Sequence, residues 1–100
     1  MPYFFSKLNP PRPSFAFDMN DEERRIMTEH AAYWTALAEK GVALLFGPVA
    51  DPKGPYGILV AQAESEVEVE KLTAKDPVIL SGKNFSFETY PMLSLVRAKE

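Results

Sequence analysis

The order of hydrophobic and polar residues predicts first a short strand and then an irregular segment. Residues 3–8, YFFSKL, form an aromatic run that is typical of a β-strand. Residues 9–20 contain three prolines, so we expect no regular element there. Phe15 and Phe17 lie in this segment, and we expect both to pack against the body of the domain.

A long amphipathic helix is predicted from residue 21 to about residue 40. Inward positions recur with spacings of four, three and four residues, at Ile26, His30, Tyr33 and Leu37, with Met27, Trp34 and Ala38 beside them. Asn20 is the expected N-cap, Glu23 stands at N3, and Gly41 suits the C-terminal cap. The only histidine of the chain, His30, is therefore expected to face inward.

Two apolar runs, at 42–49 and 58–64, predict a pair of strands. The connection between them, ADPKGPYG, is rich in turn-forming residues, so the pair should form a hairpin. Residues 85–97 predict the last strand, in which Pro91 marks an edge or a bulge.

A second helix is predicted between the hairpin and the last strand. Ser65 and Glu68 have the spacing of a capping box, and Val69 and Leu72 would share one face of the helix. The helix should end near Lys75, because the following proline disfavours a helical conformation at residue 76.

The resulting order, β-α-β-β-α-β, predicts an α+β fold of the ferredoxin-like type. Residues 1–100 would form one domain, in which the first strand is central in a four-stranded antiparallel sheet and both helices cover one face. The runs 42–49 and 58–64 are almost continuously apolar, whereas strands with one wet face should alternate. We therefore expect a homodimer in which two copies pack sheet against sheet.

Composition narrows the function classes. The chain has 100 residues, a formal net charge of −3 and no cysteine. Because there is no basic patch, we do not expect a nucleic-acid partner. Without cysteine, the sequence excludes disulfides, thiolate chemistry and Cys-type zinc sites. The N-terminus lacks the apolar run of a signal peptide and no stretch has membrane-spanning length, so we expect a cytoplasmic protein without a membrane partner.

Three residues that carry chemistry should meet at one end of the domain. His30 lies on the first helix, Asp51 in the hairpin, and Asp76 at the end of the second helix. The β-α-β-β-α-β topology brings these segments to the same end. A histidine beside a carboxylate is a proton-transfer unit, because the carboxylate selects the tautomer and supports the imidazolium. The aromatic segment 9–20 is expected to fold over this end and form a wall of a pocket.

Each candidate also has a purely structural reading. An inward histidine is more often a hydrogen-bonded core residue, and aspartate before proline suits a turn at Asp51 and a helix stop at Asp76. The candidate ligand-contacting residues are aromatic: Tyr33, Trp34, Phe15 and Phe17. Tyr33 and Trp34 suit an ordinary core better than a ligand site. One histidine with two aspartates matches no metal motif, so neither a metal nor another cofactor is expected.

Several short motifs, in their order and spacing, resemble the YciI-like (YCII-related) family. They are HAAYW at 30–34, GPVADPKGPYG at 47–57, KDP at 75–77 and a late proline at 91. The stretch EERRIMTEHAAYW, with its His-x-x-Tyr-Trp, resembles one longer subgroup. The match spans nearly the whole chain. It implies a dimeric ferredoxin-like fold related to small dimeric α/β barrels such as muconolactone isomerases.

The resemblance also implies an active site centred on a histidine and an aspartate. On this sequence the histidine is His30, and the aspartate is Asp76 of the DP pair, with Asp51 as the second candidate. The family often has an aromatic residue after the DP pair, where this chain has Val78. A few members resemble enzymes that eliminate chloride from chlorinated intermediates of aromatic degradation.

Three functions fit these observations. The first is a cofactor-free isomerase or a lyase of the dehydrochlorinase type, in which His30 transfers a proton on a small, anionic organic substrate. The second is a non-catalytic binder of a small molecule. The third is a structural dimeric domain in which His30 is only packed. An open pocket beside His30 favours the first two.

Overall fold

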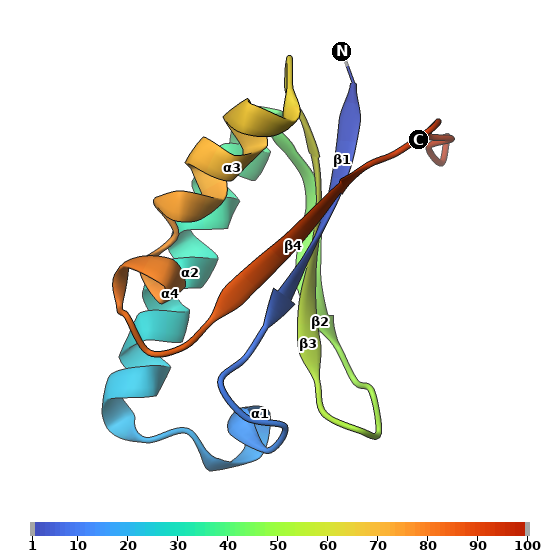
Figure 1. Ribbon diagram of the computed structural model, residues 1–100. Helices are drawn as coiled ribbons and strands as arrows, with labels where there is room; N and C mark the ends of the chain where they lie inside the picture. The colour runs from blue at the N-terminus through green and yellow to red at the C-terminus, as the bar shows by residue number, and fades with distance from the viewer. Residues whose placement is uncertain (1, 100) are drawn as a thin grey trace.

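The computed structural model describes residues 2–99, which form one four-stranded antiparallel sheet with helices on a single face (Figure 1). The elements follow in the order β1 (Tyr3–Asn9), α1 (Phe15–Asp18), α2 (Asp21–Glu39), β2 (Ala43–Val49), β3 (Tyr56–Gln62), α3 (Glu66–Ala74), α4 (Pro77–Leu80) and β4 (Ser86–Pro91). The strand order β2-β3-β1-β4 places the first strand inside the sheet, as the ferredoxin-like prediction requires. Within residues 2–99, no helix is long and apolar enough to cross a membrane.

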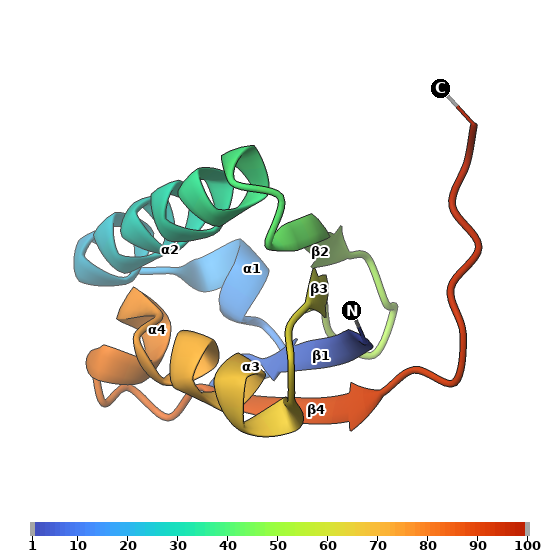
Figure 2. The same ribbon diagram turned by 90° about the horizontal axis from the view of Figure 1, so that it is seen from above.

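The core lies between the sheet and the helices. Alternate residues of β1 are buried on the helix side, where Phe4 packs with Val69 of α3. Leu8 packs in the same way with Ile26 of α2 and Val78 of α4. No other helix or strand of the described chain covers the opposite face, which is bare in both views (Figures 1 and 2). We call it the outer face of the sheet.

Local side-chain bonds start both long helices where the sequence predicts. At α2 the Asn20 side chain accepts from the backbone N–H of Glu23 at 2.8 Å, and the Glu23 carboxylate accepts from that of Asn20 at 2.9 Å. This is the predicted capping box. At α3 only half of the box forms, because Glu68 donates its N–H to Ser65 Oγ while its carboxylate accepts from the N–H of Glu64.

Two short helices depart from the expectations. Residues 9–20 do hold a regular element, because α1 forms one turn after the last of the three prolines. The helix α4 forms where no element was expected. Its N-cap is Asp76, and Pro77 occupies the first turn, where a missing N–H leaves no bond unmade. The proline that ends α3 therefore also begins α4.

The last strand is shorter than predicted and ends at Pro91 rather than at residue 97. Pairing stops there because the neighbouring strand β1 begins at Tyr3, whose carbonyl accepts the N–H of Met92. Beyond this point the chain leaves the sheet on the side away from the helices (Figures 1 and 2).

Candidate active site

Asp76 is a fully buried carboxylate that several donors converge on. Its Oδ1 accepts from the backbone N–H of Val78 at 3.0 Å, and its Oδ2 accepts from Nε1 of Trp34 at 2.6 Å. Both partners can only donate, so both oxygens of Asp76 act as acceptors. The residue is therefore held in one orientation by bonds from α2 and α4.

The third donor to this carboxylate is His30. Its Nδ1 lies 2.8 Å from Oδ2 of Asp76 and 3.0 Å from Oδ1. An acceptor-only carboxylate places the ring proton on Nδ1, which leaves a lone pair on Nε2 in the neutral imidazole. The histidine is thus oriented by a buried partner, as the sequence predicted for the pair His30 and Asp76.

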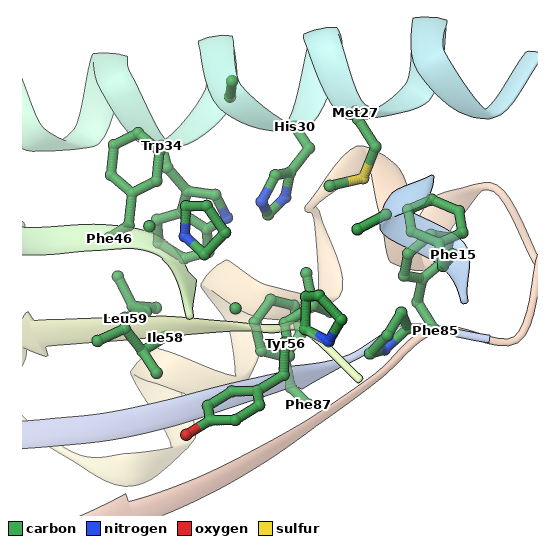
Figure 3. Close-up of a pocket in the computed structure, with 18 of the residues that line it drawn as sticks. Phe15, Met27, His30, Trp34, Phe46, Tyr56, Ile58, Leu59, Phe85 and Phe87 are labelled. Atoms are coloured by element: carbon green, nitrogen blue, oxygen red, sulfur yellow. The ribbon is translucent and has the colours of Figure 1, made fainter. Parts of the chain in front are cut away.

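The other ring nitrogen of His30 is reached by solvent. Among residues 2–99, Nε2 has no hydrogen-bond partner, and every fully buried side-chain nitrogen or oxygen has one. The His30 side chain is 15% exposed and borders a cavity of about 350 Å³. Figure 3 shows the ring descending from α2 toward the space between the helix and the sheet. A small molecule in this cavity would meet Nε2.

The walls of the cavity are almost wholly apolar. They come from the segment between β1 and α2, from α2 itself, from the hairpin strands, and from Phe85 and Phe87 at the start of β4. Within residues 2–99, the lining side chains with a polar atom are His30, Tyr56 and Trp34, whose indole N–H is bonded to Asp76. The hydroxyl of Tyr56 points away from His30 in Figure 3. The cavity has the size and the lining of a small-molecule site.

The segment 9–20 forms one wall, as predicted, through Phe15. This ring is buried and meets the ring of Phe85 edge to face, with centroids 5.1 Å apart. Arg12 fastens the segment to α2, because its guanidinium donates two bonds of 2.8 Å to the carboxylate of Glu23 and a third to Asp18. Bonds from Arg12 and then from the N–H of Asn20 lower the pKa of Glu23 from 4.5 to about 2.

Of the other predicted wall residues, one lines the cavity and two do not. Trp34 lines the cavity while its indole N–H holds Asp76. Tyr33 does not line it, because its hydroxyl donates to the carbonyl of Leu72 at 2.6 Å on α3. Burial and then the negative charge of Asp76 raise the pKa of Tyr33. The prediction that Phe17 packs on the body is wrong, because this residue is 81% exposed.

Asp51 is not brought to His30. Its carboxylate accepts from the backbone N–H of Lys53 at 2.9 Å, and its carbonyl accepts from Gly54, so both bonds shape the hairpin turn. The residue does not line the cavity. Of the two aspartates that the topology brings to this end, the structure pairs only Asp76 with the histidine.

Several lining residues escaped the sequence analysis, notably Phe46, Phe85 and Phe87. For Phe85 and Phe87 the signal was present in the alternation of FSF at 85–87, which turns both phenylalanines to one side. Alternation alone does not tell whether that side meets a core or a cavity. In residues 2–99, no three histidine, aspartate or glutamate side chains are grouped so as to hold a metal ion.

A solved structure with the same fold is that of 5-chloro-2-hydroxyhydroquinone dehydrochlorinase (TftG) from Burkholderia phenoliruptrix AC1100, in complex with 2,5-dihydroxybenzoquinone. The similarity has a TM-score of 0.51 at 20% sequence identity, and it covers 85% of this chain and 90% of that one. At this identity the likeness concerns the fold. A search of curated proteins finds no match.

The model of the YCII-related domain matches residues 3–93. This range runs from β1 through the end of β4, and so it includes His30, Asp76 and every element of the sheet. The resemblance seen in the short motifs is confirmed over almost the full length. The chain belongs to the YCII-related domain family.

Proposed function

We propose that this protein is a cofactor-free enzyme that transfers a proton to and from a small organic molecule at Nε2 of His30. One observation carries the proposal: Asp76 holds Nδ1 of His30, while Nε2 borders the cavity without a partner among residues 2–99. A general base needs both an orienting group and access for the substrate. Asp76 is then a positioning residue and His30 the catalytic one.

The reaction follows from this arrangement. Nε2 takes a proton from an acidic O–H or C–H group of the substrate, and the imidazolium that forms is paired with the carboxylate of Asp76. The electron pair left on the substrate has two outcomes. In an isomerisation it shifts, and His30 returns the proton to another atom. In an elimination it forms a new double bond and expels an anion such as chloride, and His30 then releases its proton to water.

Elimination is the reaction to assay first. The fold is shared with a protein that is named as a dehydrochlorinase, and that protein's complex contains a ring compound of small size.

A second candidate is a binding protein without turnover. The cavity wall supports it, because no second acid–base side chain beside His30 lines the cavity in the described chain, Tyr56 being turned away. A single base that both removes and returns the proton is enough for the enzyme, so only turnover separates the two.

The deciding experiment measures chloride release from 5-chloro-2-hydroxyhydroquinone, together with solvent deuterium exchange into a panel of weak carbon acids. We expect a rate that His30→Asn abolishes and that Asp76→Asn lowers by roughly one hundredfold or more, as losses of acid–base groups do. Asp51→Asn is the matched control, because it makes the same substitution in the hairpin away from the cavity. A rate that survives His30→Asn would refute the enzyme proposal.

We propose further that two copies of the chain assemble through the outer face of the sheet. Strand pairing places a set of apolar side chains there: Tyr3, Phe5, Leu45, Val49, Ile58, Val60 and Tyr90. Leu93 and Val96, in the segment that follows β4, are also fully exposed. A patch of this kind on one side of a small domain is typical of an interface. A second copy presents the same patch, so the contact is self-complementary.

A further inference from the structure

The cavity presents almost no polar group except one nitrogen, and this decides which molecules it suits. No lysine, arginine, aspartate or glutamate of residues 2–99 lines it. Two cationic side chains lie near aromatic rings of the wall, although neither residue lines the cavity. Arg12 lies 5.3 Å from the ring centre of Phe15, and Lys7 lies 4.6 Å from that of Tyr56. The guanidinium of Arg12 is already paired with two carboxylates.

The charge at the site is unfavourable to an anion. Asp76 is fully buried and carries a negative charge as an acceptor of three donors. A carboxylate ligand would bring a second negative charge close to it, with only a protonated His30 between them. An unpaired charge that leaves water for an apolar wall carries a large desolvation cost. A neutral ligand carries no such cost.

The size and shape of the cavity set a second limit. A cavity of about 150 Å³ lined by aliphatic and aromatic side chains suffices for benzene. The cavity here is about 350 Å³, and its walls include the rings of Phe15, Trp34, Phe46, Phe85 and Phe87. It therefore has room for a substituted ring or two fused rings, held by aromatic contacts.

From these observations we infer the substrate class of the proposed enzyme: a neutral molecule of one or two rings that directs a weakly acidic hydroxyl, that of a phenol or an enol, at Nε2 of His30. That this molecule undergoes proton transfer rests on the proposed function. That it binds in the cavity does not. The tautomer held by Asp76 makes Nε2 an acceptor, so the ligand must offer a donor there. It replaces the expectation of an anionic substrate, for which the described wall offers no lysine or arginine.

Three compounds of similar size, which differ only in the group opposite the propyl chain, test the class: 4-propylphenol, 4-propylbenzoate and 4-propylanisole. Their affinities can be measured by calorimetry and by the NMR signals of the imidazole, which are unambiguous because the chain has one histidine. We expect 4-propylphenol to bind about tenfold more tightly than 4-propylanisole, which is the effect of one hydrogen bond. We expect 4-propylbenzoate to bind more weakly still.

The variant His30→Leu supplies the control. It replaces the imidazole acceptor with an apolar side chain of similar length. We therefore expect 4-propylanisole still to bind, and 4-propylphenol to bind no more tightly than 4-propylanisole. Binding of 4-propylbenzoate as tight as that of 4-propylphenol would overturn the class. Equal binding of the phenol and the anisole to the unchanged protein, or no binding of any of the three, would overturn it too.

These are equilibrium measurements, so they separate the two proposals. If the benzoate wins while turnover still requires His30, the enzyme proposal stands and the substrate class falls. If the phenol wins and no turnover is found with any compound, the class stands for a binding protein and the enzyme proposal falls.

Discussion

Nδ1 of His30 lies 2.8 Å from Oδ2 of Asp76, although 46 residues separate the two in the chain. The histidine belongs to α2 and the aspartate caps α4, so the pair exists only because these two helices pack against each other. Trp34, one turn further along α2, donates to the same oxygen of Asp76. The orientation of Nε2, the His30 nitrogen at the cavity, therefore depends on these hydrogen bonds to Asp76.

Asp76→Asn should lower the free energy of unfolding by about 1–3 kcal/mol, the usual cost of a buried donor that loses its acceptor. The NH₂ group of asparagine cannot accept, so at least one donor among His30, Trp34 and Val78 is left unpaired. Urea denaturation measures the change. Asp51→Asn, in the hairpin, should change it by less than about 0.5 kcal/mol. Equal effects of the two substitutions would contradict the central role of Asp76 in the fold.

Phe15→Ala and Phe17→Ala form a matched pair in α1. Phe15 is 4% exposed and Phe17 is 81% exposed. We expect Phe15→Ala to cost about 3 kcal/mol, the low end for a buried phenylalanine because one side of the ring borders the cavity. In a domain of this size that corresponds to a fall in Tm of roughly 12–24 °C.

Phe17→Ala should leave the Tm nearly unchanged, since Phe17 is already exposed to water. Differential scanning calorimetry measures both variants. A small effect of Phe15→Ala would mean that the segment between β1 and α2 is not held against the body.

Glu23 makes stability depend on acidity. Because its pKa is lowered from 4.5 to about 2 in the folded chain, the ionised form stabilises the fold above about pH 4.5. That contribution is lost as the pH falls from 4.5 toward 2. The Tm of the unchanged protein should therefore drop in this window by more than that of Glu23→Gln, which should start lower at neutral pH.

The control for this experiment is Glu29→Gln, at an exposed position of the same helix. It should follow the unchanged protein across the whole pH range. Parallel curves for the unchanged protein and Glu23→Gln would show that the bonds from Arg12 to Glu23 do not stabilise the fold.

The proposed dimer can be tested with two exposed aliphatic residues on opposite sides of the chain. Leu45, on the outer face, is 48% exposed, and Val67, on α3, is 56% exposed. We expect the unchanged protein to sediment as a dimer at micromolar concentration and Leu45→Glu to sediment as a monomer. Val67→Glu should remain dimeric. A monomeric unchanged protein would rule out the assembly.

The sequence alone determined the elements whose signals are local. The stripe on α2, the cap at Asn20 and the turn residues of the hairpin act over a few positions, so each could be read from neighbouring residues. Their order then left the ferredoxin-like arrangement as the natural topology. The stripe also predicted an inward His30, and the order of elements predicted that Asp51 and Asp76 would lie at the same end.

The tertiary structure alone decided which aspartate meets the histidine and what surrounds it. A hydrogen bond requires the right distance and angle, and these depend on how α2 crosses α4, which no local pattern specifies. The short helix α4 matters for the same reason, because Asp76 is its N-cap and the carboxylate therefore points inward. The carboxylate of Asp51 instead accepts a hydrogen bond within its own turn. From the sequence, an apolar strand residue that fills a core cannot be distinguished from one that lines a cavity. Only their packing left a space beside Nε2 of His30.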